Sequence, residues 1–391
     1  MKELEIYVHI PFCVRKCGYC DFLSAPASES VRSAYMDQLL KEIAAAGPAY
    51  RKYQVSSVFI GGGTPSVLLP AQIQRLCRQL QDSFSILQDA EVTIECNPGT
   101  LNEEKLRTYQ SCGVNRLSMG LQSADASELR LLGRIHTYEQ FMDQYQLARE
   151  LGFKNINVDI ISAIPGQKTS VYEQTLRKVI ALEPEHISAY SLIIEEGTPF
   201  SDRYGQAEQL RQKGKLQHLL PDEDEERRMY DLTKQMLQSA GYHRYEISNY
   251  ALTGYECRHN QGYWLRKNYL GIGLGASSMI ENIRFSNATD LNQYLELDMT
   301  EPDRAVSTWE KLDVSAQMEE FMFLGLRMMR GVSAEKFQKQ FSKTIEEVYG
   351  RVLVKQLKQN LIKRTDAGYC LTDYGIDVSN YVMAEYLLDD R

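Results

Sequence analysis

The sequence of 391 residues lacks any apolar run long enough to cross a lipid bilayer. Its longest apolar stretches, 158–165 and 187–194, are short and contain polar residues, whereas a membrane-spanning helix needs about 20 mostly apolar residues. The first eight residues, MKELEIYV, alternate charged and apolar side chains and contain no apolar signal-peptide region. These absences predict a cytoplasmic protein.

Positive charge is also in deficit. The chain has 44 Lys plus Arg against 52 Asp plus Glu, which gives a net charge of −8. A protein that binds along nucleic acid normally presents a surplus of positive charge. We therefore expect no nucleic-acid partner, although a net negative charge is compatible with a local basic patch on the surface. The apolar fraction of 43 % is sufficient for a full-sized core, and the length suits one large domain and a smaller one.

Cysteine is scarce outside one short loop. Three of the eight cysteines, Cys13, Cys17 and Cys20, stand in C-x3-C-x2-C spacing directly after a short apolar run. The scattered remainder fits a reducing compartment better than a disulfide framework, and we expect these residues to be small buried hydrophobes. They are Cys77, Cys96, Cys112, Cys257 and Cys370.

The three clustered thiols suit three corners of a four-iron four-sulfur (4Fe-4S) cluster, since thiolate is the usual ligand of such clusters. One iron then has no protein ligand in the motif and stays open for a small molecule, because the position two residues after Cys20 is Phe22. A zinc loop and three unrelated core cysteines are the alternatives. Zinc normally takes four ligands, and the sequence has no second C-x2-C pair. The cluster is favoured.

The first half of the chain alternates short apolar strands with amphipathic helices. Helices are expected over 30–46, 71–84, 102–112, 138–152 and 170–182. This alternation predicts a parallel sheet covered by helices, but it does not separate an open sheet from a barrel. The expected strands cover 4–10, 55–60, 91–96, 116–121, 156–161 and 186–192.

Beyond residue 198 the alternation loosens. A charged segment at 221–228 is expected to start a helix that continues to residue 240, and residues 242–285 are rich in Tyr, Asn and Gly and show no long element. A boundary is expected near 300–307. The segments after it are predicted as a long apolar helix over 310–329, shorter helices near 333–341 and 345–362, and a hairpin at 364–371. That order is similar to a winged-helix arrangement, which in an acidic chain need not bind DNA.

The string YVHIPFCVRKCGYCDF, residues 7–22, resembles the cysteine loop of the radical SAM superfamily. In that superfamily the open iron holds the amino and carboxylate groups of S-adenosylmethionine. One electron from the cluster then breaks the sulfonium C–S bond and yields a 5′-deoxyadenosyl radical. The residues ahead of the cysteines narrow the resemblance to the branch that contains oxygen-independent coproporphyrinogen III oxidase and the HemW haem chaperones. They are Tyr7, His9, Ile10 and Pro11.

The resemblance covers nearly the whole chain and implies a fold of the α/β class. A partial (β/α)6 TIM-like barrel is expected over 1–240, with its site at the carboxyl ends of the strands. An extension with a haem-binding motif is expected over 241–305. A small, mostly helical, winged-helix-like domain is expected over 306–391.

A glycine cluster, Gly61-Gly62-Gly63-Thr64-Pro65, follows the second expected strand. Consecutive glycines let the backbone approach a ligand closely and adopt positive φ angles. By itself the cluster is equally compatible with an ordinary strand-to-helix turn. The resemblance implies that Gly62, Gly63 and Thr64 receive the methionine end of S-adenosylmethionine.

Polar residues also mark the later strands. Glu95 and Gln122 end the third and fourth strands, and Asp159 lies inside an otherwise apolar fifth strand, where an unpaired charge would be costly. By resemblance these three residues and Arg134 contact S-adenosylmethionine. A surface ion pair for Arg134 and a buried capping role for Asp159 are the alternatives.

Two tyrosines complete the expected cofactor contacts. Tyr7 matches a position near the sulfonium in the oxidase, with a role in the core as the alternative. Tyr19 lies between the last two cysteines. The resemblance implies that it stacks beside the adenine, as the aromatic residue at this position does in relatives.

The stretch CRHNQGYW, residues 257–264, resembles the HNxxYW signature of HemW proteins, in which the histidine is tied to haem binding. Imidazole is a common axial ligand of haem iron, and flat aromatic rings such as Tyr263 and Trp264 can stack on a macrocycle. His259 is the expected haem ligand. Cys257 competes as a thiolate ligand, so the axial ligand stays open between the two.

Within this branch two functions compete. The oxidases abstract hydrogen from two propionate side chains of coproporphyrinogen III, which then lose carbon dioxide. They usually carry a further cysteine where this chain has Phe22, and a longer segment before the first strand. These departures, together with HNxxYW, favour a haem chaperone that binds haem and delivers it to acceptor proteins. A radical SAM methylase or regulator is a third, less favoured class.

The resemblance also implies cofactors and partners. The cofactors are a 4Fe-4S cluster and S-adenosylmethionine, with haem as cargo or a porphyrinogen as substrate. Respiratory haem enzymes are the expected type of acceptor. Flavodoxin or ferredoxin is the expected type of electron donor, and peripheral membrane contact is compatible with the family. The oligomeric state and any use of radical chemistry in haem transfer are left open.

Overall fold

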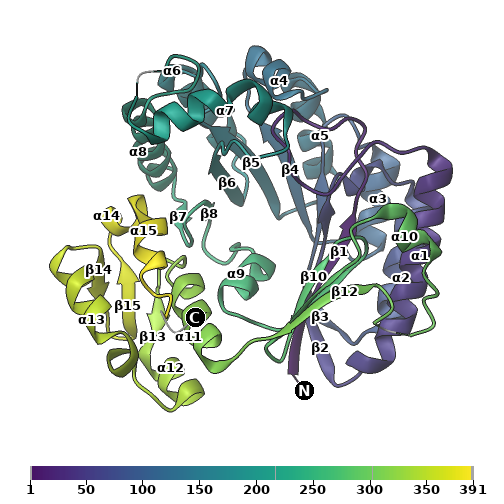
Figure 1. Ribbon diagram of the computed structural model, residues 1–391. Coiled ribbons are helices and arrows are strands. Elements are labelled where there is room, and N and C mark those ends of the chain that lie inside the picture. Colours follow the sequence, from purple (N-terminus) through teal and green to yellow (C-terminus); the bar gives the residue numbers. More distant parts are fainter. Residues whose placement is uncertain (1, 216, 302, 389–391) are drawn as a thin grey trace.

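The computed structural model describes residues 2–215, 217–301 and 303–388. A twelve-stranded sheet has the strand order β12-β11-β10-β9-β1-β2-β3-β4-β5-β6-β8-β7, and a separate three-stranded sheet has the order β13-β15-β14. Figure 1 shows the large sheet curving round, with the small sheet and its helices set to one side. No helix in the described part of the chain combines the length and the hydropathy that a membrane crossing requires.

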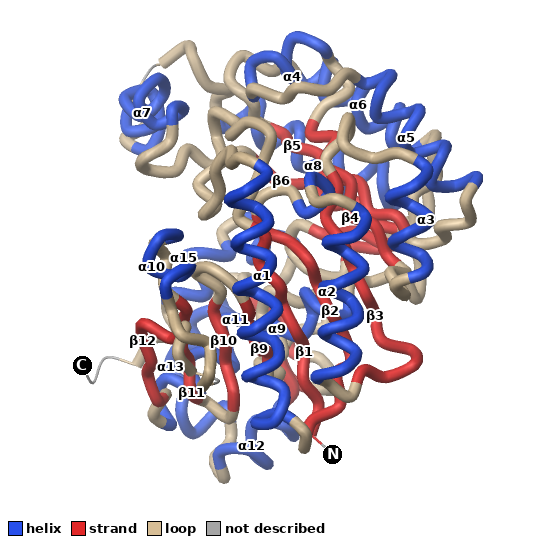
Figure 2. The backbone as a smooth tube through the Cα atoms, turned by 90° about the vertical axis from the view of Figure 1, so that its right-hand side faces the viewer, coloured by secondary structure: helices blue, strands red, loops and turns tan. Residues whose placement is uncertain are grey.

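Six consecutive parallel strands form the middle of the large sheet, as predicted. They are β1 (Lys2–Ile10), β2 (Tyr53–Gly62), β3 (Ile86–Cys96), β4 (Arg116–Gln122), β5 (Ile156–Ser162) and β6 (His186–Ser191). Helices that alternate with these strands pack on the sheet (Figure 2). They are α1 (Glu29–Ala46), α2 (Pro70–Ser83), α3 (Glu103–Ser111), α5 (Tyr138–Glu150) and α6 (Thr169–Ile180). The predicted partial (β/α)6 barrel is therefore confirmed.

Alternating side chains give the two faces of this sheet different chemistry, because successive strand residues point to opposite faces. On β4, Leu117, Met119 and Leu121 are fully buried in the core beneath the helices. The intervening residues of β4 to β6 line the interior of the barrel and are mostly polar. They include Arg116, Ser118, Asn157, Asp159 and Ser188. A functional site inside the barrel is thus made of polar side chains that the strands hold at fixed positions.

The residues expected to form no long element add short strands to both edges of the sheet. At one edge, β8 (Asn249–Ala251) pairs antiparallel with β6 and with β7 (His243–Arg244). At the other edge, β9 (Tyr269–Ile272) runs parallel to β1. The strands β10 (Ser277–Ile280), β11 (Ile283–Asn287) and β12 (Val306–Lys311) follow β9 antiparallel, and α10 (Leu291–Glu296) lies between the last two. The segment 306–311, expected to open the C-terminal unit, thus pairs within the large sheet.

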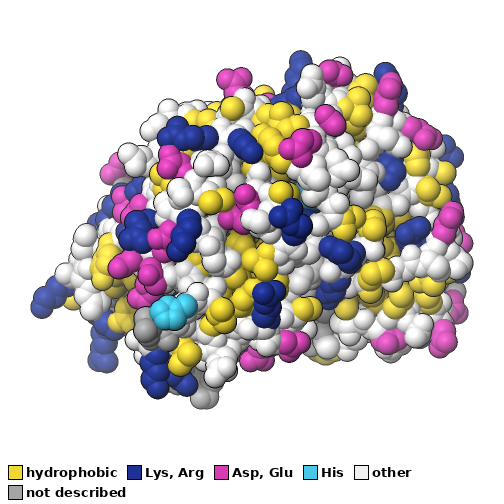
Figure 3. All heavy atoms as spheres, turned by 90° about the horizontal axis from the view of Figure 1, so that it is seen from above, with side chains coloured by type: hydrophobic (Ala, Val, Ile, Leu, Met, Phe, Trp, Pro, Cys, Tyr) yellow, Lys and Arg dark blue, Asp and Glu magenta, His cyan; other side chains and the backbone are white. Residues whose placement is uncertain are grey.

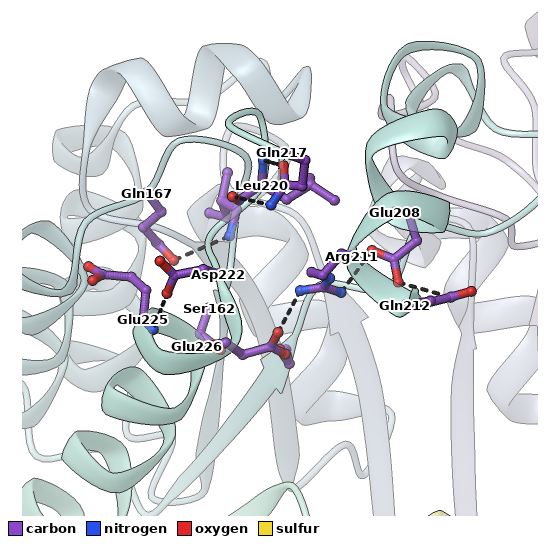
Figure 4. Close-up of polar contacts among 12 residues, drawn as sticks. Ser162, Gln167, Glu208, Arg211, Gln212, Gln217, Leu220, Asp222, Glu225 and Glu226 are labelled. Carbon is purple, nitrogen blue, oxygen red and sulfur yellow. Dashed lines mark hydrogen bonds and ion pairs between the residues drawn. The ribbon is translucent and has the colours of Figure 1, made fainter. Parts of the chain in front are cut away.

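Two helices of the barrel half were not predicted, α4 (Ala126–Leu132) and α7 (Pro199–Gln212). Charged contacts join α7 to α8 (Glu223–Ser239), the helix expected over 221–240. Figure 4 shows Arg211 of α7 between Glu208, at 2.8 Å, and Glu226 of α8, at 2.6 Å. The polar composition of α7 hid it from the sequence, because only Phe200, Tyr204 and Ala207 are buried in it.

The C-terminal part has its own core and the winged-helix-like order of elements. Its helix α11 (Val314–Gly325) is shorter than the predicted helix over 310–329, which was wrong at both ends. The Asp313 side chain accepts a hydrogen bond from the Ala316 backbone N–H at 2.8 Å and caps the helix there. The remaining elements are β13 (Val332–Ser333), α12 (Ala334–Phe341), α13 (Ile345–Lys358), β14 (Ile362–Arg364), β15 (Gly368–Leu371), α14 (Asp373–Asp377) and α15 (Ser379–Ala384).

Candidate functional site

The register of the first two strands brings the cysteine loop and the glycine cluster together. Ile10, the last residue of β1, pairs with Gly62 of β2 in parallel. The two loops therefore leave the sheet side by side, and the Gly63 backbone N–H donates a hydrogen bond to the Ile10 carbonyl oxygen at 2.9 Å. This adjacency follows from parallel pairing and is independent of any ligand.

Cys13, Cys17 and Cys20 are free thiols that line one cavity of about 130 Å³. Backbone contacts hold their loop, because the Cys13 N–H donates to the Ala25 carbonyl and the Cys20 N–H donates to the Cys17 carbonyl. Among the described residues, no three His, Cys, Asp or Glu side chains gather closely enough to hold a single metal ion. Three thiols spaced around one cavity instead fit the wider spread of ligands around an iron–sulfur cubane.

The glycine cluster closes another wall of this cavity, which Gly62, Gly63 and Thr64 line. Gly62 has a φ angle of 112°, in the region that favours glycine. A Cβ atom at Gly63 would lie 2.6 Å from the Phe12 carbonyl oxygen, so this position accepts no side chain without a shift of the backbone. The glycines are therefore needed for the close packing of the two loops.

Glu95 and Asp159 bring two carboxyl groups into the same cavity. Burial, and then the charge of Asp159, raise the pKa of Glu95 to about 8, while the Gly62 N–H donates to its Oε2 at 3.0 Å. Burial also raises the pKa of Asp159, which accepts a hydrogen bond from the Asn157 amide at 2.7 Å. Two desolvated carboxyl groups favour a cationic ligand between them.

Arg134 reaches the cysteine loop from the segment after α4. Its Nη2 atom donates to the Asn97 side-chain oxygen at 2.6 Å and to the Gly120 carbonyl at 2.8 Å. Its Nη1 atom donates to the Cys17 sulfur at 3.7 Å. These contacts exclude the alternative of a surface ion pair. Arg134 is thus held by the barrel and faces the cysteine loop.

Gln122 and Tyr19 lie where this cavity opens into a larger one of about 490 Å³, and both side chains line both cavities. Gln122 has a φ angle of 71°, unusual for a residue other than glycine, at the point where the pairing of β4 with β5 shifts register. Tyr7 lines only the larger cavity, where its hydroxyl lies 3.0 Å from His9 Nδ1. The structure thus gathers all the expected cofactor contacts around two joined cavities.

The HNxxYW stretch forms α9 (Arg258–Trp264), a short helix beside the barrel interior rather than a loop. Its His259 lines the larger cavity but is only 1 % exposed. Both ring nitrogens have partners, with Nδ1 2.9 Å from the Ser57 hydroxyl and Nε2 2.9 Å from the Tyr263 hydroxyl. Burial lowers the pKa of His259 to about 3, so the imidazole is neutral at physiological pH.

Cys257, the competing ligand, directly precedes α9 and is fully buried. It is not among the described residues that line the larger cavity. Its sulfur lies 3.4 Å from Glu91 Oε1, and burial raises the pKa of its thiol. Trp264, the last residue of the motif, lies away from His259 in a separate cavity of about 700 Å³ against the C-terminal part. The motif therefore does not form one stacked aromatic pocket around His259 in this conformation.

The sequence reasoning missed several residues that line the larger cavity. They are Phe59, Arg116, Ser118, Asn157, Ser188 and Tyr190. The strand period of two could have found Arg116, Ser118 and Asn157, because they share the inward face of β4 and β5 with Gln122 and Asp159, which were singled out. Ser188 and Tyr190 lie on β6, on which the sequence singled out no residue. Seen from above, the surface carries interspersed basic and acidic side chains, with hydrophobic groups between them (Figure 3).

Similarity to known proteins extends over the whole chain. Residues 7–179 match the radical SAM superfamily, and residues 312–378 match the HemN C-terminal domain. Heme chaperone HemW of Lactococcus lactis is 35 % identical over 389 residues, which cover 100 % of this chain and 98 % of that protein. Heme chaperone HemW of Bacillus subtilis is 34 % identical over 387 residues, which cover 97 % of this chain and 98 % of that protein.

Among solved structures, coproporphyrinogen III oxidase (HemN) from Escherichia coli matches with a TM-score of 0.84. The match covers 99 % of this chain and 90 % of that chain at 24 % sequence identity. It bears on the fold alone, in which the barrel and the C-terminal part of the two proteins correspond.

Proposed function

The chain belongs to the HemW family of the radical SAM superfamily, and on that basis we propose that it is a haem chaperone that binds haem and delivers it to acceptor proteins. The observation that carries the proposal is the similarity to curated HemW proteins over the entire chain. Phe22 after the cysteine loop and the HNxxYW stretch support the same choice. A haem acceptor such as a respiratory haem enzyme, and an electron donor such as flavodoxin or ferredoxin, belong to this proposal.

We further assign Cys13, Cys17 and Cys20 as the protein ligands of a 4Fe-4S cluster, with S-adenosylmethionine as its partner. When bound, these groups supply one-electron chemistry. The cation of Arg134 beside Cys17, and the shared cavity of the three thiols, support the assignment. All eight cysteines are free, which supports a reducing compartment, the cytoplasm.

The other residues that the sequence marked as cofactor contacts are assigned to S-adenosylmethionine. The close-packed backbone of Gly62 and Gly63 and the hydroxyl of Thr64 face the methionine end, while Glu95 and Asp159 balance positive charge. Arg134 and Gln122 contribute hydrogen-bond donors. Tyr7 and Tyr19 border the adjoining part of the larger cavity and exclude water from it.

The raised pKa of Glu95 gives the cofactor site a testable pH dependence. With a pKa of about 8, this carboxyl group is mostly protonated at neutral pH before a cation binds. A cationic ligand binds the ionised form, so ionisation of Glu95 should by itself raise the affinity for S-adenosylmethionine about tenfold between pH 7 and pH 9. Anaerobic calorimetry on reconstituted protein measures the change.

The matched control is Glu95→Gln, which keeps the shape and removes the titration. The variant retains only the pH dependence that belongs to the ligand's own amino group, so the difference between the two profiles isolates Glu95. Identical profiles for wild type and Glu95→Gln would show that Glu95 does not titrate on binding.

His259 is assigned as the haem ligand. Because its ring is buried and hydrogen-bonded, binding of iron requires a neutral imidazole and a free ring nitrogen. The neutral imidazole is the form that ligates iron, and a pKa of about 3 keeps it neutral across the physiological range. Nε2 must leave the Tyr263 hydroxyl to reach iron. Haem binding by this route therefore needs a movement of α9 or of Tyr263.

Haem titration of three variants tests this assignment. We expect His259→Ala to weaken haem binding at least about tenfold and to change the visible spectrum, because an axial ligand is lost. Tyr263→Phe frees Nε2 and should bind haem more tightly than wild type. Cys257→Ser should leave the spectrum unchanged. A changed spectrum in Cys257→Ser with an unchanged one in His259→Ala would assign the ligand to Cys257 instead.

The fold shared with coproporphyrinogen III oxidase makes that reaction the competing function. Reconstituted protein incubated without oxygen with reductant, S-adenosylmethionine and coproporphyrinogen III should form no protoporphyrinogen. Chromatography of the same mixture follows 5′-deoxyadenosine. Formation of protoporphyrinogen would replace the chaperone proposal by the oxidase.

A further inference from the structure

Arg116, the first residue of β4, is a guanidinium buried inside the barrel. It is only 2 % exposed, yet it lines the cavity of about 490 Å³. Its Nε atom is buried without a hydrogen-bond partner. Within the described ranges, no hydrogen bond or ion pair of this side chain is present. Arginine stays charged in proteins, and a buried charge without a partner is costly.

Two carboxylates that raise the pKa of Arg116 by charge interaction, Glu91 and Asp159, are committed to other groups. Glu91 accepts hydrogen bonds from the Arg258 and His259 backbone N–H groups, at 3.0 and 3.2 Å. It thereby provides an acceptor for two backbone donors in the first turn of α9. Asp159 accepts from the Asn157 amide at 2.7 Å and from the Ser118 hydroxyl at 3.5 Å. Arg116 influences both carboxylates only through longer-range charge interaction. Its planar donor groups therefore remain available to a ligand.

The place of Arg116 in the barrel indicates which ligand. Arg116 and Gln122 stand at opposite ends of β4, and six residues of strand span about 20 Å. The cysteine loop and the proposed methionine site line the smaller cavity, which reaches along β4 from Gln122 to Ser118. Arg116 is among the described residues that line the larger cavity but not among those that line the smaller one, so its guanidinium faces a different space from the methionine group. An anion at Arg116 comes from a second ligand.

The cavity wall restricts the chemistry of that ligand. Of the described residues that line it, Arg116 is the one Lys or Arg, while Asp21, Glu95, Asp159 and Glu195 are acidic. A phosphate with two charges would be repelled, whereas a single carboxylate matches one planar guanidinium with two parallel hydrogen bonds. Aromatic side chains supply flat apolar walls. They are Tyr7, Tyr19, Phe59, Tyr190 and Tyr263.

We propose that Arg116 is a carboxylate subsite for the tetrapyrrole cargo and binds one of its propionate groups inside the barrel. The proposal rests on the proposed haem-chaperone function and adds to it a residue that anchors the cargo. The ring lies against the aromatic walls, and the propionate neutralises the buried guanidinium. Arg116 lies on the same cavity as His259, so a propionate anchored there holds the macrocycle beside α9.

Haem and haem dimethyl ester distinguish this role from a structural one, because the ester keeps the ring and iron but removes both negative charges. For cluster-loaded protein, we expect Arg116→Gln to weaken haem binding about ten- to a hundredfold. The variant should bind the dimethyl ester as wild type does. Arg116→Lys should recover part of the haem affinity, since it restores charge without the planar pair of donors.

A control variant and a melting temperature complete the test. Arg107→Gln removes an exposed arginine of α3 that pairs with Glu103, and it should bind both ligands as wild type does. Removal of an unpartnered buried charge should leave the Tm of Arg116→Gln unchanged or raised. Equal haem affinity in wild type and Arg116→Gln overturns the subsite, as does parallel loss of haem and ester binding with a lowered Tm. Failure of wild-type protein to bind haem would instead reject the chaperone function.

Discussion

Replacement of Cys13, Cys17 and Cys20 together by alanine is expected to abolish iron–sulfur cluster assembly. The three thiols line one cavity, and the other cysteine of that cavity, Cys96, is a buried residue at the end of β3 whose thiol pKa is raised by burial. Removal of all three leaves the iron without protein thiolates, and iron binding in such sites depends on thiolate ligands. Iron and sulfide content and visible absorbance after anaerobic reconstitution measure the loss, which should exceed about tenfold.

The matched control is Cys370→Ala. Cys370 is also a buried free cysteine, but it lies on β15 in the C-terminal part. This variant should assemble as much cluster as wild type, because only the position of the thiol differs. A full cluster in the triple variant would refute the assignment of the three ligands, since iron would then be held elsewhere.

Gly63→Ala is expected to have the second large effect, on both stability and the cluster. The added Cβ would lie 2.6 Å from the Phe12 carbonyl oxygen and 2.9 Å from the Phe12 nitrogen. Both contacts are with backbone, so the two loops must move apart and displace the neighbouring Cys13. Overpacking of this kind costs about 2–3 kcal/mol. Urea unfolding and iron content measure the two consequences.

Gly205→Ala provides the comparison for this variant. Gly205 lies within α7, where an added Cβ would lie 3.6 Å from Ser201 Oγ, an ordinary van der Waals contact. Alanine in an unobstructed helical position should stabilise by about 0.5–1 kcal/mol. If Gly63→Ala had the same stability and iron content as Gly205→Ala, the close packing of the two loops would not be required for the site.

Local sequence patterns determined much of the barrel. The six strands were predicted because each combines an apolar run with a flanking turn signal, and their order along the chain matches their order in the sheet. The helix over 30–46 was also predicted closely, since Ser28 caps α1 and apolar residues recur at helical spacing. In contrast, β8 and β9 pair with strands far away in the sequence. Short segments of this kind are stabilised by their partners, so local propensity gives little signal.

The helix expected over 310–329 shows the same limit of prediction from local sequence. Residues 310 and 311 are in β12 because they pair with Arg284 and Ile283 of β11, a contact invisible in the local sequence. The helix starts only after the cap at Asp313. Tertiary pairing thus overrode an apolar pattern that by itself suited one long helix.

For the site, the sequence alone determined which chemistry is present, because the spacing of Cys13, Cys17 and Cys20 and the glycine cluster are local features. Tertiary structure decided which other groups meet that chemistry. Parallel pairing puts the two loops side by side, and strand alternation turns Arg116 into the barrel, where its Nε atom has no hydrogen-bond partner among the described residues. It also buries His259 between Ser57 and Tyr263. Burial and hydrogen bonding depend on neighbours distant in the chain, so they emerge only when the fold brings those neighbours together.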